Sequence, residues 1–309
     1  MEQLNDDLPL VSILIPTYNR LKYLKRALDS ALSQMYPNLE IIICDNSEGA
    51  ETKDYIEGLM KTTSNVFYNK NKENIKYIGN MRRCLELANS EYVNFLMDDD
   101  LFAPQKIETM MAYCLKDSDI HLVTSPRYVI NDDDQAIAPY LMGLQLEKDW
   151  IGEGQELLKL SIQTIDNFIG EPTTVLFKKS ALKFSFGQYY HHEFIVYSDL
   201  VTWYSLLESG KCVYLKEALS YFRRHQSQTT AESEKDWGGE LRGFDEAAKL
   251  ADVASLHHIF KTRVEYTQFI TNLLEIYSVA FKRLITEKGE GLQIPSTYPR
   301  LMYDLLSRI

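Results

Sequence analysis

The feature that most constrains this chain is a short apolar run that ends in three consecutive carboxylates. Residues 92–97 read YVNFLM, and Asp98, Asp99 and Asp100 follow directly. An apolar run of this length, bounded by polar residues, is typical of a buried strand rather than of a helix. In an open α/β sheet, ligands bind beyond the carboxyl ends of the strands. The sequence therefore predicts that the three acids lie at the mouth of a binding site.

Three adjacent carboxylates repel one another unless a positive charge lies among them. Hard oxygen ligands suit Mg²⁺ or Mn²⁺, which also bind phosphate oxygens, so we expect a metal–diphosphate site here. A second triple acid, residues 132–134, lies in NDDDQ between two apolar stretches, residues 122–130 and 136–144. That position is typical of a solvated turn, and we interpret the second triplet as a turn.

Size and charge restrict the function further. A chain of 309 residues, 45% hydrophobic and 25% charged, can form one large domain with an appendage, or two domains. The formal net charge of −11 argues against nucleic acid as a partner, although a nucleotide can bind through a metal. The four cysteines are scattered, so we expect buried free thiols in a reduced compartment and no thiolate zinc site. We also expect no secretory signal and no membrane span.

Strands and helices alternate along the first half of the chain, which predicts a largely parallel sheet with right-handed crossovers. The expected strands are residues 10–15, 39–44, 66–69 and 92–97, and the expected helices are residues 21–34, 51–62, 79–88 and 106–115. Polar residues follow three of these strands, so parallel packing would bring them to one edge of the sheet. They are Thr17, Tyr18 and Asn19, then Asp45, then the first triple acid.

A nucleoside would fit that edge. Asp45 can accept the ring N–H of uracil or thymine, or the N–H edge of guanine, and Tyr18 can stack on the base. Each residue alone is also typical of a turn or a helix cap, so the convergence carries the prediction. No G-x-G-x-x-G follows the first strand and no G-x-x-x-x-G-K-[ST] occurs, which excludes a dinucleotide fold and a P-loop.

Several segments resemble, in order, the signature segments of the inverting family 2 glycosyltransferases with the GT-A fold. They span about residues 10–230 and read VSILIPTYNR, EIIICDNS, ANSEYVNFLMDDD with Pro104, IGEPTTVLFKKSAL, YSDLVTWYSLLESG and YFRRHQSQTT. The resemblance implies an α/β, Rossmann-like fold with a mostly parallel central sheet flanked by helices. Apolar residues recur at helical spacing from about residue 237 onward. We therefore expect a catalytic domain over residues 1–230 and a C-terminal helical region over residues 231–309.

The resemblance also implies roles for particular residues. Those implied for the nucleotide are Pro16, Thr17, Tyr18, Asn19, Asp45, Lys76, Asn80 and Asp98. Those implied for the Mg²⁺ or Mn²⁺ cofactor are Asp99, Asp100 and His225, and those implied for the acceptor are Glu171 and Thr173. The pairs Asp98-Asp99 and Asp98-x-Asp100 are alternative metal motifs. In the register set by Pro104, Met97 stands where the family often has its first acid.

Asp199 is the residue that the resemblance implies as general base. The family usually has Glu-Asp at the start of a helix in this segment, and here the pair is Ser198-Asp199. Direct inversion needs a base within hydrogen-bond reach of the acceptor hydroxyl, opposite the departing diphosphate. Asp199 is also placed to be a helix N-cap, since residues 200–207 are helical in pattern, and the two roles are compatible.

Together these implications give a metal-dependent inverting glycosyltransferase. It would move a sugar from a nucleoside diphosphate, UDP foremost, to a hydroxyl of a saccharide, a glycoconjugate or a lipid-linked saccharide in cell-surface polysaccharide or glycan synthesis. The alternative is a catalytically weak nucleotide-sugar-binding or scaffold protein of the same fold, because Met97 and Ser198 replace the usual acids. We expect a cytoplasmic protein, with contact to the inner face of the membrane and homo-oligomers through the C-terminal helices as open alternatives.

Overall fold

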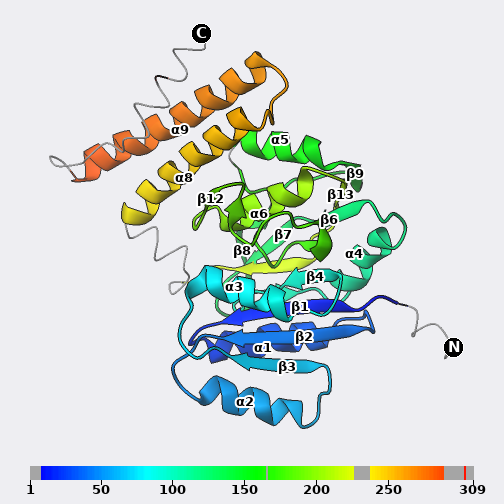
Figure 1. Cartoon of the computed structure of the whole chain (residues 1–309). Helices are drawn as coiled ribbons and strands as arrows, with labels where there is room; N and C mark the ends of the chain where they lie inside the picture. The colour runs from blue at the N-terminus through cyan, green and yellow to red at the C-terminus, as the bar shows by residue number, and fades with distance from the viewer. Residues whose placement is uncertain (1–7, 165, 226–236, 289–302, 304–309) are drawn as a thin grey trace.

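A large mixed sheet forms the middle of the molecule. The structure is a computed structural model that describes residues 8–164, 166–225, 237–288 and 303. The eight strands of the sheet lie in the order β3-β2-β1-β4-β10-β6-β13-β9, and helices cover both of its faces (Figure 1). The α/β architecture that the sequence predicts is therefore confirmed.

The first half of the chain builds the parallel part of this sheet. Its strands are β1 (Val11–Thr17), β2 (Leu39–Asp45), β3 (Val66–Lys70) and β4 (Tyr92–Phe95), all paired in parallel. The helices between and after them are α1 (Leu21–Leu32), α2 (Glu51–Met60), α3 (Lys76–Leu87) and α4 (Lys106–Cys114). Every residue of β1 is buried, as expected for a strand whose two faces are both covered by helices.

The second half of the chain is mixed in direction, whereas the parallel arrangement predicted from the first half holds for the strands of that half. Its strands in the main sheet are β6 (Ile120–Thr124), β9 (Trp150–Glu153), β10 (Leu176–Lys178) and β13 (Lys211–Tyr214). Strand β10 runs antiparallel to both β4 and β6, and β9 runs antiparallel to β13. The helical elements here are α5 (Gly154–Thr164), the 3₁₀ turn η1 (Lys179–Ala181) and α6 (Ser198–Leu207).

A four-stranded sheet, ordered β5-β14-β7-β8, lies against the parallel part. Its strands are β5 (Leu101–Phe102), β7 (Arg127–Ile130), β8 (Ala136–Met142) and β14 (Ser220–Arg223). The apolar stretch of residues 122–130 is thus divided between two sheets, and it divides at Pro126, which cannot donate a ladder hydrogen bond. The second triple acid is a turn between β7 and β8, as predicted. A two-stranded ribbon pairs β11 (Gln188–Tyr189) with β12 (His192–Glu193).

Three shifts in element boundaries affect the site. Strand β1 continues two residues beyond the predicted strand and ends at Thr17. Strand β4 is shorter than predicted and ends at Phe95, because the Asp100 N–H donates back to the Met97 carbonyl at 3.1 Å and the chain turns. Helix α3 begins at Lys76 instead of residue 79. Thr17 therefore belongs to the sheet, and the triple acid belongs to a turn that follows β4.

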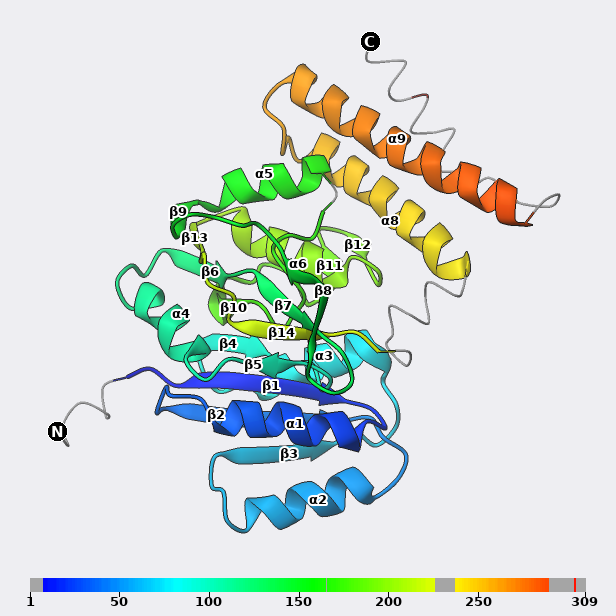
Figure 2. The ribbon, with the colours of Figure 1, turned by 180° about the vertical axis from the view of Figure 1, so that it is seen from behind.

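The helices α8 (Trp237–Leu256) and α9 (Arg263–Lys288) lie at the end of the molecule opposite α2 (Figures 1 and 2). Leu250 of α8 and Phe269 of α9 belong to the same buried core cluster as Trp203 of α6 and Leu158 of α5. The described part of the helical region thus shares a core with the sheet. Among the described residues, no helix combines the length and the apolar character that crossing a membrane requires. All four cysteines are buried free thiols, as predicted.

Candidate active site

The carboxyl ends of the parallel strands bring the predicted polar residues together. Thr17, the last residue of β1, lies opposite Asp45, the last residue of β2. On its other side the Thr17 hydroxyl donates to Asp98 Oδ2 at 2.7 Å. Residues from three separate segments therefore meet at one edge of the sheet, which is the convergence that the alternation of strands and helices predicts.

The triple acid is buried and held from several directions. Asp98, Asp99 and Asp100 are each less than a tenth exposed. Arg20 Nη1 lies 3.4 Å from Asp98 Oδ1 and 2.9 Å from Asp99 Oδ2. Asp100 accepts hydrogen bonds from the Thr173 hydroxyl at 2.6 Å and from a backbone N–H at 2.9 Å. Hydrogen bonds to a buried carboxylate stabilise its charged form, and burial itself disfavours that form.

The pKa values show which effect is larger. Burial, followed by the charge of Asp99, raises the pKa of Asp98 to about 7, against the opposing effect of Arg20. The same two causes, burial first and the Asp99 charge second, raise the pKa of Asp100 well above its usual range. Burial is therefore the larger effect at both carboxyl groups, the Asp99 charge adds to it, and an added cation would lower both pKa values.

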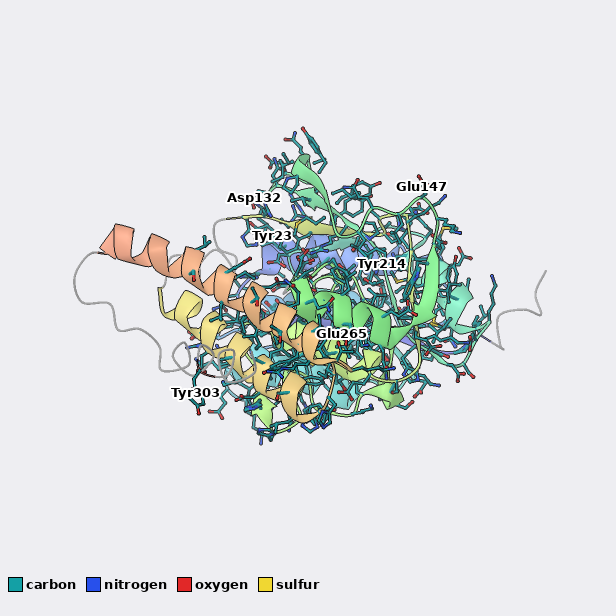
Figure 3. All side chains as sticks on the ribbon, turned by 90° about the horizontal axis from the view of Figure 1, so that it is seen from above. Tyr23, Asp132, Glu147, Tyr214, Glu265 and Tyr303 are labelled. Atoms are coloured by element: carbon teal, nitrogen blue, oxygen red, sulfur yellow. The ribbon has the colours of Figure 1, made fainter. Side chains whose placement is uncertain are left out.

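His225 and Arg223 complete this cluster from β14 and the residues after it. The His225 ring is almost fully buried, and its Nε2 lies 3.0 Å from Asp99 Oδ2. Arg223 donates through Nε to the Asp99 carbonyl at 2.7 Å, and its backbone N–H is the one that donates to Asp100. Tyr23 stacks on the His225 ring with centroids 4.6 Å apart. Figure 3 shows Tyr23 beside Asp132 of the β7–β8 turn, and the Tyr23 hydroxyl donates to that carboxylate.

The residues in this cluster fit a divalent cation in kind. The carboxylate oxygens of Asp99 and Asp100 are ligands that Mg²⁺ or Mn²⁺ accepts, and the imidazole nitrogen of His225 suits Mn²⁺ better than the harder Mg²⁺. In the part of the chain that the structure describes, no group of three or more His, Cys, Asp or Glu side chains is placed so that it could hold a metal ion. Arg20 and His225 both approach Asp99 Oδ2. The Arg20 guanidinium thus places a positive charge beside this oxygen, and the His225 ring is a second hydrogen-bonding partner of it.

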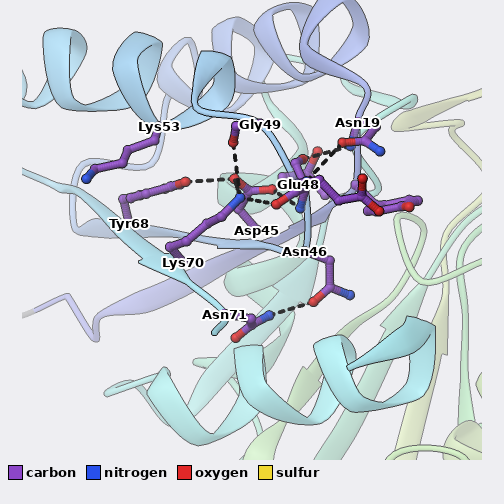
Figure 4. A network of polar contacts seen from close by, with 12 residues as sticks. Asn19, Asp45, Asn46, Glu48, Gly49, Lys53, Tyr68, Lys70 and Asn71 are labelled. Carbon is purple, nitrogen blue, oxygen red and sulfur yellow. Dashed lines mark hydrogen bonds and ion pairs between the residues drawn. The ribbon is translucent and has the colours of Figure 1, made fainter. Parts of the chain in front are cut away.

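The Asp45 carboxylate is fully buried and lies at the centre of a polar network (Figure 4). Its Oδ1 accepts the Ser47 N–H at 2.6 Å, and its Oδ2 accepts the Tyr68 hydroxyl at 2.7 Å and lies 3.2 Å from Lys70 Nζ. Tyr68 and Lys70 both belong to β3, the next strand of the sheet. Asp45 is therefore fixed in orientation, and Lys70 supplies a positive charge that the sequence did not single out.

The other residues predicted for the nucleotide divide into buried and exposed ones. Pro16 lies inside β1, and Asn80 is buried and donates to the Cys44 carbonyl at 2.9 Å, which ties α3 to β2. Tyr18 is 42% exposed beside the cluster, and the Asn19 N–H donates to the Ser47 hydroxyl at 2.8 Å. The Lys76 side chain is exposed, and its carbonyl accepts from the Asn46 amide at 3.2 Å.

Glu171 and Thr173 lie close together but make different contacts. The buried Thr173 hydroxyl accepts the Met97 N–H at 3.0 Å and donates to Asp100, so it fixes the turn that carries the triple acid. Glu171 forms a two-point ion pair with Arg127, with Nε to Oε2 at 2.7 Å and Nη2 to Oε1 at 2.8 Å. Its charge also raises the pKa of Asp100.

Asp199 lies in the first turn of α6 and is mostly buried. Helix α6 begins at Ser198 with Tyr197 as the N-cap, so the predicted capping role of Asp199 is wrong. Burial is the main cause that raises the pKa of Asp199 to about 7; the Leu200 N–H opposes the shift, and the charge of Glu171 adds to it. Asn167 donates its side-chain amide to Asp199 Oδ2 at 3.0 Å and so fixes the carboxylate.

Tyr77 lies close enough to both this carboxylate and the triple acid for their charges to affect its pKa. Burial raises the pKa of the Tyr77 phenol well above its usual range, and the charges of Asp199 and, more weakly, Asp99 raise it further. Glu171 likewise influences both Asp100 and Asp199. Asp199 and the triple acid therefore share two neighbours, Tyr77 and Glu171, although 99 residues separate Asp199 from Asp100 in the sequence.

Sequence reasoning missed several charged members of the site. Each of them pairs with a carboxylate or carbonyl of the site: Arg20 with Asp99, Lys70 with Asp45, Arg127 with Glu171 and Arg223 with the Asp99 carbonyl. Arg20 directly follows the predicted Asn19, so its position gave a signal. Arg223 and Arg224 are adjacent, and the sequence offered no means of telling which one points inward. In the structure Arg223 is buried, whereas Arg224 is exposed with Nη2 3.7 Å from Met142 Sδ.

Comparison with known proteins gives consistent matches. The family model described as glycosyl transferase family 2 matches residues 12–186. The chain is 27% identical over 320 residues to GalNAc(5)-diNAcBac-PP-undecaprenol beta-1,3-glucosyltransferase of Campylobacter jejuni, covering 98% of each chain. It is 26% identical to the putative teichuronic acid biosynthesis glycosyltransferase TuaG of Bacillus subtilis, covering 70% of this chain and 79% of TuaG.

The fold also matches solved structures. The crystal structure of S. aureus TarS 1-349 in complex with UDP-GlcNAc superposes with a TM-score of 0.66 at 16% sequence identity. The match covers 97% of this chain and 81% of that chain. A likeness at this level of identity shows the fold, and it confirms the fold that the ordered segments predict.

Proposed function

The chain belongs to glycosyl transferase family 2 and is a glycosyltransferase enzyme, and on that premise we propose that it is a metal-dependent, inverting transferase that uses a UDP-sugar. The observation that carries this proposal is the charge of the triple acid. Three buried carboxylates lie side by side, and two of them have raised pKa values although Arg20 lies against the cluster. A divalent cation bound here would balance this negative charge, and its open coordination positions would take oxygens of the diphosphate of a nucleotide sugar.

The residues would divide the work as follows. Asp99, Asp100 and His225 would hold the cation, which neutralises the negative charge of the leaving diphosphate. Asp45 would accept the ring N–H of the uracil, Tyr18 would stack on the base, and Thr17 and Asp98 would orient the ribose. Two features support this division: Thr17 bonds Asp98, and the Tyr68 and Lys70 contacts fix the Asp45 carboxylate.

Asp199 would act as the base. Its carboxylate would take the proton of the acceptor hydroxyl while that oxygen bonds to the anomeric carbon and the bond from carbon to the diphosphate oxygen breaks. Attack from the face opposite the diphosphate inverts the anomeric configuration. A pKa of about 7 supports this role, because a base with a pKa close to the working pH accepts the proton most effectively.

The names of the relatives support the substrate classes. TarS binds UDP-GlcNAc, and the Campylobacter jejuni relative acts on a saccharide linked through diphosphate to undecaprenol. We therefore propose a UDP-sugar donor and a saccharide acceptor carried on a lipid, in the synthesis of a cell-surface glycan. Glu171 would contact the acceptor, because its charge raises the pKa of both Asp100 and Asp199 and it is therefore a neighbour of both.

Calorimetry tests the donor site. In wild type, UDP should bind in the presence of Mn²⁺, and Asp99→Ala should weaken that metal-dependent binding at least about a hundredfold through loss of a charged ligand. Asp133→Ala, in the exposed second triple acid, is the matched control and should bind UDP as wild type does. Unchanged affinity in Asp99→Ala would count against the assignment.

Turnover tests the chemistry. With Mn²⁺ and a panel of UDP-sugars, wild type should release UDP, and Asp199→Asn should still bind UDP but lose release by about 10²–10⁴-fold. Binding without turnover in wild type would favour the alternative of a nucleotide-sugar-binding protein. Release of pyrophosphate instead of UDP would indicate a nucleotidyltransferase.

A further inference from the structure

A polar cavity lies between α5, the end of α6 and the connection from α8 to α9. Its volume is about 310 Å³, and Gln155, Lys183, Tyr190, Glu208 and His257 are among the residues that line it. Helix α5 lies beside the place where the chain turns from α8 into α9 (Figure 2). Glu208 follows α6 at its carboxyl end, nine residues from Asp199, which is about 13 Å along the helix. The cavity is therefore separate from the donor cluster.

The lining of this cavity is basic. Lys159, Lys183 and Lys261 line it together with His257 and His258, against the single carboxylate of Glu208. The chain as a whole carries a formal net charge of −11. Because acidic residues outnumber basic ones in the whole chain, a cavity lined mainly by basic residues is unexpected from composition alone. The positive charge of the lysines in the lining favours an anionic ligand.

The one carboxylate in the lining is already bonded. Glu208 Oε1 accepts the Tyr189 hydroxyl at 2.6 Å and the Tyr190 hydroxyl at 2.8 Å, and Oε2 lies 2.9 Å from Lys183 Nζ. Lys159 Nζ lies at the longer distance of 3.8 Å from Glu265. The Lys261 backbone N–H donates to Glu265 Oε2 at 3.0 Å, but its ammonium group forms no ion pair with a carboxylate among the residues that the structure describes. Lys159 and Lys261 are thus the ammonium groups best placed to meet a ligand.

The backbone around the cavity is held in an unusual conformation. Tyr190 and His258 have positive φ values of 51° and 50°. Non-glycine residues seldom adopt this region, and where they do the surroundings fix them, often at functional sites. The other described non-glycine residues with positive φ are Asn19, Lys76 and Asp134. Asn19 and Lys76 border the donor cluster and Asp134 bonds Arg223, so the strained positions gather at two places, of which this cavity is one.

An aromatic face and an adjoining hollow enlarge the site. The Tyr190 and His257 rings stack with centroids 3.4 Å apart and an interplanar angle of 14°. A neighbouring hollow of about 280 Å³ shares His258 and Lys261 with the cavity and adds Arg263. Flat rings beside several cations suit a ligand that has both an organic part and an anionic group.

We propose that this cavity binds a phosphate-bearing molecule through Lys159, Lys183, Lys261 and the two histidines. Phosphate oxygens accept several charge-assisted hydrogen bonds at once, which matches donors that converge from three segments of the chain. A volume of about 310 Å³ exceeds that of a single phosphate group and leaves room for the organic part. The phosphate belongs either to a soluble ester or to the headgroup of an anionic lipid.

Metal-free calorimetry separates this site from the donor site. Inorganic pyrophosphate is titrated into the protein in EDTA, where the proposed donor site has no cation to hold a diphosphate. Wild type should bind one pyrophosphate, and the double variant Lys159→Gln/Lys261→Gln should bind at least about tenfold more weakly. Lys53→Gln/Lys61→Gln, two exposed lysines on and just after α2, is the matched control and should bind as wild type does. UDP affinity with Mn²⁺ should be equal in all three proteins.

Co-sedimentation identifies the source of the phosphate. Vesicles of phosphatidylglycerol and phosphatidylcholine should pull down wild type, but not Lys159→Gln/Lys261→Gln, if the phosphate is a lipid headgroup. Pyrophosphate binding without vesicle binding assigns a soluble phosphate ester. The proposal is overturned if wild type binds neither pyrophosphate nor vesicles, or if the double variant binds pyrophosphate as tightly as wild type does. These outcomes do not depend on whether UDP binds or transfer occurs.

Discussion

Two aspartates of the site, Asp98 and Asp199, have a pKa of about 7, and they reach it in different surroundings. Burial is the largest cause at both residues, but for Asp98 the charge of the adjacent Asp99 is the second cause, so a bound cation would lower the Asp98 pKa again. For Asp199 no member of the triple acid is among the main causes: burial raises its pKa first, the Glu171 charge adds to the shift, and Asn167 is a neutral donor to the carboxylate. At the residue scale, Asp98 is therefore suited to binding a metal or the ribose, and Asp199 is suited to proton transfer.

The pH dependence of transfer should therefore follow Asp199. A general base works in its deprotonated form, so kcat of wild type at saturating donor and Mn²⁺ should rise between about pH 6 and pH 8, with its midpoint near 7. Asp199→Asn should lower kcat by about 10²–10⁴-fold and remove that rise. The check is the profile of kcat against pH for both proteins. A wild-type kcat that stays level from about pH 5.5 to pH 8 would contradict the role of Asp199.

The same pKa predicts an effect on stability. The folded pKa of Asp199 is about 7 and its ordinary value is 3.8, so between these values the folded state binds a proton that the unfolded state has lost. Stability therefore falls as pH rises through this window, and the full penalty is present above about pH 7. Asp199→Asn removes the penalty and should be more stable than wild type by about 1–3 kcal/mol at pH 8.

Urea unfolding at two pH values measures this effect. The difference between Asp199→Asn and wild type should be largest at about pH 8 and should disappear near pH 4, where Asp199 is protonated in the folded state. Asp133→Asn, an exposed aspartate, is the control and should change stability by less than about 0.5 kcal/mol at either pH. A destabilised Asp199→Asn at pH 8 would show that the charged carboxylate contributes to folding.

At the scale of elements, the turn between β7 and β8 does more than connect two strands. The Asp134 carboxylate pairs with the fully buried Arg223 side chain, and Arg223 Nη1 donates to the Asn131 carbonyl at 2.5 Å. Arg26 of α1 donates to the Asp132 carbonyl at 2.6 Å. Because Arg223 also holds the Asp99 carbonyl, the turn indirectly fixes the triple acid.

Asp134→Asn should disturb the donor site indirectly, through Arg223. Asparagine tolerates the φ of 62° at this position, so the turn itself should persist while the charge that pairs with Arg223 is lost. We expect a loss of about 1 kcal/mol in stability, since Asp134 is partly exposed, and a rise of about threefold to tenfold in KM for the UDP-sugar. Thermal unfolding and steady-state kinetics measure the two effects.

Asp133→Asn is the matched control in the same turn. It removes the same charge from an exposed side chain and should leave both stability and KM unchanged. Equal effects of the two variants would mean that the net charge of the turn matters and that the pair with Arg223 does not. A lower kcat with unchanged KM in Asp134→Asn would place the effect on the chemical step.

These contacts show what local sequence patterns could predict and what they could not. The strand before the first triple acid, the turn at residues 132–134 and the convergence of Thr17, Asp45 and Asp98 follow from patterns of a few residues. The pair of Asp134 with Arg223 joins positions 89 residues apart, and neither position carries a local signal for the other. The reversed direction of β10 likewise depends on which strand edge is open after β4 forms, and its own sequence does not specify it.

At the scale of the whole molecule, the C-terminal helices support the catalytic segment. Glu246 of α8 is 1% exposed, and its carboxylate accepts the backbone N–H groups of Ile195, Val196 and Tyr197 at 2.8, 2.9 and 3.0 Å. These three residues lead directly into α6, whose first turn carries Asp199. A carboxylate that satisfies backbone N–H groups just before a helix stabilises that end of the helix.

Glu246→Gln should therefore affect catalysis through the position of Asp199. The amide has one acceptor oxygen for three donors and carries no charge, so buried N–H groups lose partners, at an expected cost of about 1–3 kcal/mol in stability. The start of α6 should loosen, which should lower kcat by about tenfold while the affinity for UDP with Mn²⁺ stays within about twofold of wild type.

Asp245→Asn separates this effect from a general effect of charge on α8. Asp245 is the adjacent residue and pairs with Lys249 at 3.3 Å on a partly exposed face. Among the described residues it forms no hydrogen bond or ion pair with the segment before α6. Its substitution should change stability by less than about 0.5 kcal/mol and leave kcat unchanged. If Glu246→Gln lost UDP affinity as strongly as kcat, α8 would support the whole sheet edge instead of the start of α6. If kcat stayed at the wild-type value despite lower stability, the helical region would contribute to folding alone.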